Sequence, residues 1–143
     1  MTQRTLLLLA LFSAPVSAQE RPAALVLDTE IQAAWALSPA TGEAVGDLVH
    51  TRDRAGNLRL VGEVLEEPGA PIFLAERLLS APSQEIRWAT SASLAASPHA
   101  SPDLVDTLLT LETDPRARSL LLSASKYWAD EDALNTLRTA LSD

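Results

Sequence analysis

Helix-breaking residues divide the chain at nearly regular intervals. The breaks fall at Pro22, Pro39, Gly56, Pro68–Pro71, Pro82, Pro98–Pro102, Pro115 and the acidic cluster Asp130–Asp132. Successive breaks are about 13 to 17 residues apart, which is the length of one helix plus a short turn. Alanine and leucine fill the intervals and β-branched residues are sparse, so helix propensity agrees with segment length. The sequence therefore predicts an all-α fold of about seven to eight helices.

Apolar residues recur with the helical period inside several of these intervals. Such stripes cover residues 58–65, 104–111, 117–128 and 134–141. In the longest one, Ala117, Leu121 and Ala124 share one helix face with Trp128. Each stripe predicts a helix with one buried face. Because the turns between them are short, successive helices are expected to pack as antiparallel neighbours.

Side chains that suit the N-cap position stand at several predicted helix starts. Ser101 and Asp114 each precede a proline, which favours the first helical position because it needs no backbone N–H there. Thr41 and Asn57 are further N-cap candidates. A helix is accordingly predicted to begin after Asn57 and to continue through Leu65.

Two of the predicted helical pairs match each other at a shift of about 30 residues. Residues 72–96 align with residues 104–129 when one residue of slack is allowed in the turn. In both units a capping side chain precedes an arginine by four residues. The alignment pairs Ser83 with Asp114 and Arg87 with Arg118. The last segment, residues 133–141, matches the first helix of a further unit.

An earlier segment fits the same pattern less closely. Between Glu43 and Leu65, Asp53 precedes Arg59, and Ala55-Gly56 is treated as an insertion in the turn. The sequence thus predicts successive units along most of the chain, each built from two helices.

A period near 30 residues, two helices per unit, a turn aspartate and an arginine early in the second helix resemble the HEAT-like repeat family. The resemblance covers Asp28 to the C-terminus and implies a right-handed α-solenoid in which the aspartate and arginine link adjacent units. Ser83 replaces the turn aspartate, and Gly62 stands where the family usually has alanine. An independent helical bundle is the alternative architecture.

The first eighteen residues have the composition of a secretory signal peptide. Arg4 precedes the apolar run Leu6–Phe12, Pro15 follows it, and Val16-Ser17-Ala18 supplies the small residues of a cleavage site. We therefore predict a signal peptide over residues 1–18 and a helical repeat domain over residues 19–143; a buried N-terminal helix is the alternative. No later segment is long enough to span a bilayer, so we expect a soluble protein that is periplasmic or secreted.

Composition argues against several kinds of chemistry. The net charge of −8 opposes nucleic acid binding through a basic surface. Cysteine is absent and the two histidines, His50 and His99, have no carboxylate–histidine motif around them, so neither a metal nor another cofactor is expected. Neither a nucleophile elbow nor a phosphate-binding loop is present. We predict a non-catalytic protein.

Four residues are candidates for partner binding. Arg59, Arg87 and Arg118 hold equivalent places in successive predicted units, which would form a ladder of arginines along one side of the stack. The ladder could join units through the turn aspartates, or present a basic stripe to an acidic peptide. Trp88 lies off the apolar stripe and is a candidate anchor, whereas Trp128 is expected in the core.

The sequence predicts an exported protein-interaction module, acting as a scaffold or regulatory subunit for a protein or peptide partner. The acidic net charge would favour a partner with a basic surface. One alternative is a small enzyme or enzyme-accessory domain with a loop site that gathers His99, Ser101 and Asp103. Another is a purely structural helical bundle.

Overall fold

The computed structural model describes residues 22–128 and 130–141. The predicted signal peptide, residues 1–18, lies outside the described residues. The elements follow each other as α1 (Ala23–Leu37), α2 (Pro39–Gly46), β1 (Val49–Arg52), β2 (Leu58–Val61), the 3₁₀ helix η2 (Glu63–Glu66), α3 (Ala70–Leu79), α4 (Gln84–Ala96), α5 (Pro102–Leu111), α6 (Pro115–Leu122), the 3₁₀ helix η3 (Ser123–Tyr127) and α7 (Asp130–Leu141). The predominantly helical fold predicted from the sequence is confirmed.

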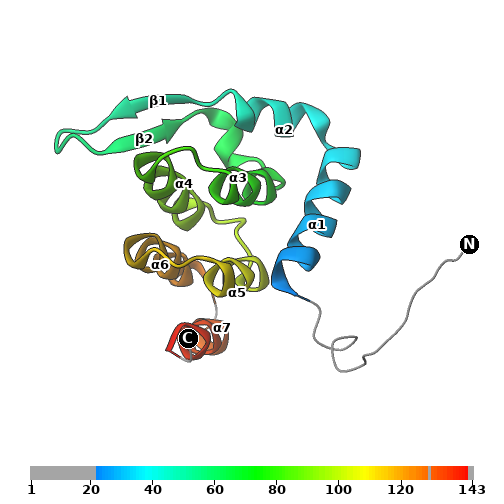
Figure 1. Cartoon of the computed structure of the whole chain (residues 1–143), viewed down its shortest axis with the longest axis vertical. Coiled ribbons are helices and arrows are strands. Elements are labelled where there is room, and N and C mark those ends of the chain that lie inside the picture. The colour runs from blue at the N-terminus through cyan, green and yellow to red at the C-terminus, as the bar shows by residue number, and fades with distance from the viewer. Residues whose placement is uncertain (1–21, 129, 142–143) are drawn as a thin grey trace, which may run out of the picture.

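Most of the helices pack in successive layers. Helix α3 packs against α4 and α5 against α6, while α4 also contacts α6 and α5 contacts α7. Figure 1 shows these layers one below the other, with α7 at the bottom. Helix α1 runs beside them and contacts both α3 and α5, and α2 packs on α3. The hairpin of β1 and β2 projects from the top layer and contacts α4 through β2.

Leucines from these layers form one continuous core. The fully buried ones come from five helices: Leu27, Leu74, Leu78, Leu94, Leu108, Leu109 and Leu121. The stripes predicted over residues 104–111 and 117–128 supply several of them, which places those stripes on the buried faces of α5 and α6. Trp128 packs against this core, as expected, and donates from Nε1 to the carbonyl oxygen of Ala100 at 3.0 Å.

Capping side chains set where three of the helices begin. Ser83, Ser101 and Asp114 each accept a hydrogen bond from the backbone N–H three residues ahead. Proline fills the first helical position after Ser101 and Asp114. The predicted caps at these two residues are confirmed. Thr41 instead lies inside α2.

The helix predicted from Asn57 to Leu65 is wrong, because this segment contains strand β2. Strands β1 and β2 pair antiparallel, with Val49 opposite Val61 and Arg52 opposite Leu58. Leu58, Val61 and Leu65 have helical spacing, but burial in β2 alternates from residue to residue, as in a strand with one covered face. The unit predicted between residues 43 and 65 is therefore a helix followed by a hairpin.

The turn between β1 and β2 explains why a hairpin forms here in place of the predicted helix. The carbonyl oxygen of Asp53 accepts from Gly56 N at 3.0 Å, and Gly56 has a φ of 84°, which glycine adopts without steric cost. Asp53 N in turn donates to the carbonyl oxygen of Asn57 at 3.0 Å. A tight turn followed by a glycine of positive φ is a common three-residue hairpin connection. Asn57 therefore closes a hairpin and caps no helix.

Candidate functional site

A cleft of about 380 Å³ lies between the hairpin and the helices α4 and α6. Its floor is one face of α4, where the side chains of Ala89, Ala92, Ser93 and Ala96 are all small. Residues of β2 and of the following turn form one wall, and Arg116 and Leu120 of α6 contribute to the other. Because small residues cover the floor, β2 and α6 stand apart above α4 and leave an open space between them.

Trp88 is the aromatic side chain of this cleft, and residues of α6 hold it in place. It is half-buried, and its Nε1 donates to Asp114 Oδ2 at 2.8 Å. The guanidinium carbon of Arg116 lies 4.4 Å from the centre of the indole ring, in a cation–π arrangement. The indole is thus fixed at its edge and on one face before any ligand arrives.

Asp114 organises the α6 side of the cleft. Its carboxylate accepts from Ala117 N at 2.8 Å as the N-cap of α6, and Gln84 Nε2 also donates to it. The backbone hydrogen bond from Ala117, followed by that from Trp88, lowers the pKa of Asp114 below its ordinary value. Asp114 is therefore an anion at neutral pH and orients the Trp88 ring.

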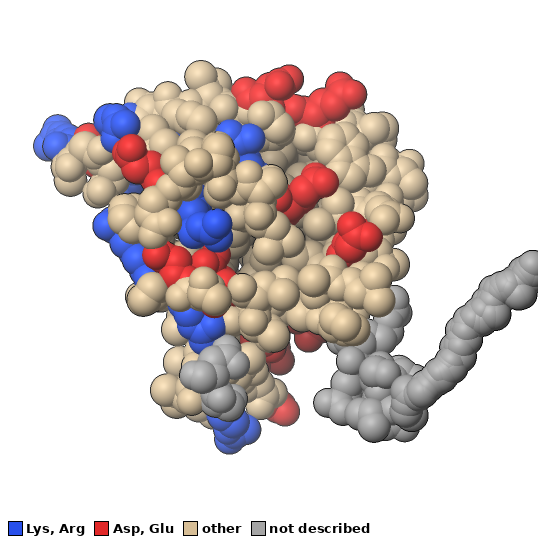
Figure 2. Space-filling view, viewed as in Figure 1, with Lys and Arg blue, Asp and Glu red and all other residues tan. Residues whose placement is uncertain are grey.

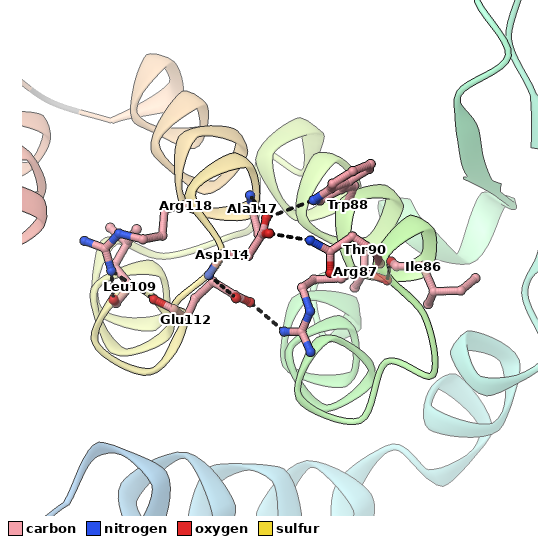
Figure 3. A network of polar contacts seen from close by, with 10 residues as sticks. Ile86, Arg87, Trp88, Thr90, Leu109, Glu112, Asp114, Ala117 and Arg118 are labelled. Carbon is pink, nitrogen blue, oxygen red and sulfur yellow. Dashed lines mark hydrogen bonds and ion pairs between the residues drawn. The ribbon is translucent and has the colours of Figure 1, made fainter.

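Two of the predicted partner-binding arginines, Arg87 and Arg118, point away from the cleft into a polar network centred on Glu112 (Figure 3). Arg87 Nη1 donates to Glu112 Oε1 at 2.9 Å, and only 5% of the Glu112 side chain is exposed. Glu112 Oε2 accepts from the backbone N–H of Asp114 at 2.9 Å. Arg118 donates to the carbonyl oxygens of Leu109, Glu112 and Ala140. Both arginines therefore join neighbouring helices.

The third arginine, Arg59, lies on β2 and lines the cleft together with Trp88. Its guanidinium forms an ion pair with Asp53 at 3.3 Å, and 59% of its side chain is exposed. The expected arginine ladder is not formed, because Arg59 belongs to a strand whereas Arg87 and Arg118 belong to α4 and α6. The expected pairing with a turn aspartate holds for Arg59, whereas Arg87 pairs with Glu112.

A second ion pair joins the hairpin to the start of α4. Arg52 Nη1 donates to Glu85 Oε2 at 2.7 Å, and this contact lowers the pKa of Glu85. On the hairpin turn, the backbone N–H of Asn57 donates to Asp53 Oδ1 at 2.8 Å and is the main cause of a lowered pKa at Asp53. Glu85 and Asp53 are therefore both ionised and hydrogen-bonded at neutral pH.

The three residues of the alternative enzyme site, His99, Ser101 and Asp103, lie around the start of α5. His99 is exposed in the turn after α4, Ser101 is the N-cap of α5, and Asp103 is exposed in the first turn of that helix. Among the described residues, no group of three or more His, Asp or Glu side chains is placed to hold a metal ion. The other histidine, His50, lies on β1 with its Nε2 3.2 Å from Arg77 Nη2.

Arg116 is a cleft residue that sequence reasoning missed. A signal for it exists in the repeat, since Arg116 stands two residues after its cap Asp114, as Glu85 does after Ser83. Because α6 packs on α4, a side chain early in α6 is expected to reach the matching turn of α4, where Trp88 lies. In contrast, none of the sequence patterns described above predicts the hairpin that forms the other wall.

Charge is distributed unevenly around the molecule. In Figure 2 the Lys and Arg side chains gather on the left, over the hairpin and the neighbouring ends of the helices. Helices α1 and α2 carry Asp28, Glu30 and Glu43 and no basic residue. The cleft lining carries both signs, with Arg59 and Arg116 beside Glu66 and Glu85, in a protein of net charge −8.

Over residues 22–128 and 130–141, none of the helices is both long and apolar enough to cross a membrane. In comparisons with protein-family models, curated proteins and solved structures, nothing matched the chain. Its function is therefore inferred from the cleft.

Proposed function

We propose that this chain is an exported, non-catalytic interaction module that binds a protein or peptide partner in the cleft between the hairpin and α4. In this proposal residues 1–18 are a signal peptide, residues 19–143 are a helical repeat domain of HEAT-like type, and the product works in the periplasm or outside the cell. The contacts of α4 with α6 and of α5 with α7 support a solenoid-like stacking of helical pairs.

The observation that carries the proposal is the fixed indole of Trp88 beside an open, small-residue floor. Aromatic side chains held rigid before binding lose little conformational entropy when a partner packs on them, so they contribute strongly to affinity. The floor provides room for side chains of a partner. Concave surfaces with an apolar lining and a few oriented polar groups are typical of binding sites.

The charged residues in and beside the cleft indicate what kind of partner would bind there. Arg59 and Arg116 line the cleft, and Arg54 lies on the neighbouring turn. Among the described residues, neither Arg54 nor Arg116 belongs to an ion pair. These cations favour an acidic segment of the partner, whereas the acidic face of α1 and α2 is suited to a basic surface elsewhere on the same partner.

Site-specific photo-crosslinking in the cells that produce the protein tests this proposal. A photoreactive amino acid is placed at Ala92, on the cleft floor, and in a matched variant at Ala33, an exposed alanine of α1. We expect discrete cross-linked partners from position 92 that are absent from position 33. Equal adducts at both positions, or none at position 92, would contradict a binding role for the cleft.

Trp88→Ala supplies the second arm of the test. This substitution removes the fixed indole, and we expect the adducts at position 92 to fall at least fivefold. Circular dichroism and the melting temperature show whether the variant is folded. Unchanged adducts in a folded Trp88→Ala protein would count against Trp88 as the anchor.

A further inference from the structure

The cleft wall contributed by β2 is the free edge of a strand. Three consecutive residues of β2, Leu58, Arg59 and Leu60, line the cleft, together with Gly56 and Asn57 from the end of the turn. Successive side chains of a strand point to opposite faces, so a wall that includes every residue in turn contains the backbone edge. Since β1 occupies the other side of β2 in this two-stranded sheet, the edge in the cleft is the one that no strand covers.

The hydrogen-bond pattern identifies the backbone groups on that edge. Asp53 N donates to the carbonyl oxygen of Asn57, the residue directly opposite, which makes this a hydrogen-bonded pair. Bonded and non-bonded pairs alternate along an antiparallel ladder, so Thr51 with Arg59 is bonded and Arg52 with Leu58 is not. The N–H and C=O groups of Leu58 and Leu60 therefore point away from β1. Within the described part of the chain, no other backbone group is hydrogen-bonded to them.

We propose that the cleft binds an extended peptide as a third strand, paired with the backbone of Leu58 and Leu60 and lying over α4. The inference rests on the proposed binding function and specifies how the partner is recognised. Backbone pairing at a sheet edge supplies affinity that is independent of sequence, while pockets for alternate side chains supply specificity. Here the small-residue floor receives side chains from one face of the added strand.

The hairpin wall of the cleft sets the length of the segment. This wall runs from Gly56 to Leu60, which is five residues. An added strand pairs residue against residue with its neighbour, so about five residues cover the wall. A strand of that length is enough to pair with both Leu58 and Leu60.

The charges along the cleft favour an acidic residue at one end of the segment. Arg59 lies on β2 close to the hairpin turn and Arg116 lies over the Trp88 ring, whereas Glu66 follows the other end of β2. Glu85 is paired with Arg52 and Arg59 with Asp53, but 59% of the Arg59 side chain stays exposed, and Arg116 belongs to no ion pair among the described residues. The ligand class is therefore an extended peptide that alternates aliphatic and acidic residues, with an acidic side chain near Arg59 and Arg116.

Four synthetic peptides test the proposal on the purified protein. The first is a dye-labelled heptapeptide in which valine and glutamate alternate, with blocked termini. The second replaces every glutamate by lysine. The third keeps the first sequence but carries N-methyl groups on alternate amides, which removes the donors of one peptide edge; a matched isomer methylated on the other amides controls for the opposite edge. Fluorescence anisotropy measures the Kd of each.

We expect the glutamate peptide to bind at least tenfold more tightly than the lysine peptide, and one methylated isomer to lose at least tenfold while the other keeps its affinity. Equal binding of the glutamate and lysine peptides would overturn the acidic class. Equal loss or no loss in both methylated isomers would overturn pairing along one edge.

Hydrogen exchange measured by NMR provides an independent readout. On binding of the glutamate peptide, the amides of Leu58 and Leu60 should exchange at least tenfold more slowly, whereas that of Arg59, already bonded within the hairpin, should change little. Unprotected amides at Leu58 and Leu60 in a saturated complex would refute strand addition. If position 92 still cross-links a partner in cells, the binding function stands and only the mode of recognition fails.

Discussion

Two turns in this molecule begin with the same chemistry and lead to different structures. Asp53 and Asp114 each accept backbone hydrogen bonds from the residues that follow, and each precedes an arginine. After Asp114 comes Pro115, and the chain enters α6. After Asp53 the chain reaches Gly56, whose positive φ reverses its direction into β2. The capping carboxylate fixes the start of a turn, while the next three residues decide what the turn leads to.

The arginines that follow these two aspartates, Arg118 and Arg59, also differ in their surroundings. Arg118 donates to carbonyl oxygens of α5 and α7 in the interior, and its neighbour Arg87 pairs with a buried glutamate. Arg59 pairs with Asp53 in solvent and lines the cleft. One region therefore places its ion pair in a buried network, and the other keeps its ion pair at the surface, where 59% of the Arg59 side chain is exposed.

The largest loss of stability is expected for substitutions in the core beneath the α5–α6 turn. Leu121→Ala, and separately Leu108→Ala, should lower the free energy of unfolding by about 2 to 5 kcal/mol because both side chains are fully buried. Urea unfolding measures this loss. Leu37→Ala, at an exposed position, serves as the control and should change stability by no more than about 0.5 kcal/mol. An unchanged melting temperature in both core variants would contradict the assigned buried faces.

The next prediction compares the contributions of two ion pairs, Arg87–Glu112 and Arg59–Asp53, to stability. Arg87→Met removes the cation beside Glu112 and should cost about 2 kcal/mol, because a carboxylate with 5% exposure loses its ion pair while Arg87 itself is partly solvated. Arg59→Met, in the exposed hairpin pair, should leave the unfolding midpoint nearly unchanged. Urea unfolding of the two variants side by side makes the comparison. Equal losses would show that the two regions do not differ in the way described.

Gly56→Ala tests the hairpin turn. A φ of 84° is costly for a residue with a Cβ atom, so this change should destabilise the protein by about 1 kcal/mol. Gly46→Ala is the matched control, because its added Cβ meets no atom within 4 Å and its backbone has no positive φ. Thermal unfolding followed by circular dichroism distinguishes them. A Gly56→Ala protein as stable as Gly46→Ala would argue against the described turn.

The smallest effect is expected in acid, where the two turns should behave alike. The pKa values of Asp53 and Asp114 are both lowered in the folded protein, first of all by backbone N–H donors. Their stabilising contributions are therefore present above the ordinary value of 3.8 and are lost as the pH falls through the lower folded pKa. Asp53→Asn and Asp114→Asn should each make the loss of stability below that pH shallower, as measured by urea unfolding at several pH values. A steeper loss in either variant would contradict the direction of the shift.

The helical part of this fold was accessible from the sequence because its signals are local. Proline, a capping side chain and an apolar stripe at α5 and α6 all agree, and each acts within a few residues. The match of Ser83 with Asp114 also placed two caps in equivalent positions. The hairpin was missed because Leu58, Val61 and Leu65 imitate a helical spacing over a segment too short to distinguish the two periods.

The candidate site was predicted only in part. The position of Trp88 off the apolar stripe predicts a binding anchor, and Trp88 does line the cleft. The repeat pattern predicts Arg59 in a ladder on helices, whereas the residue lines the cleft from strand β2. Arg116 and the edge of β2 depend on how α6 and the hairpin sit over α4, which is a tertiary arrangement that local sequence signals do not encode.

The hydrogen bond from Arg118 to the carbonyl oxygen of Ala140 has a consequence for how the protein opens. A terminal helix usually frays on its own, with amide exchange far faster than the global rate. Here Arg118 of α6 donates to the carbonyl oxygen of Ala140, in the last turn of α7, and to that of Leu109, near the end of α5. Release of α7 therefore breaks contacts in the layer above. The C-terminal helix and the α5–α6 pair should therefore open as a single cooperative unit, and the hairpin should open separately from it.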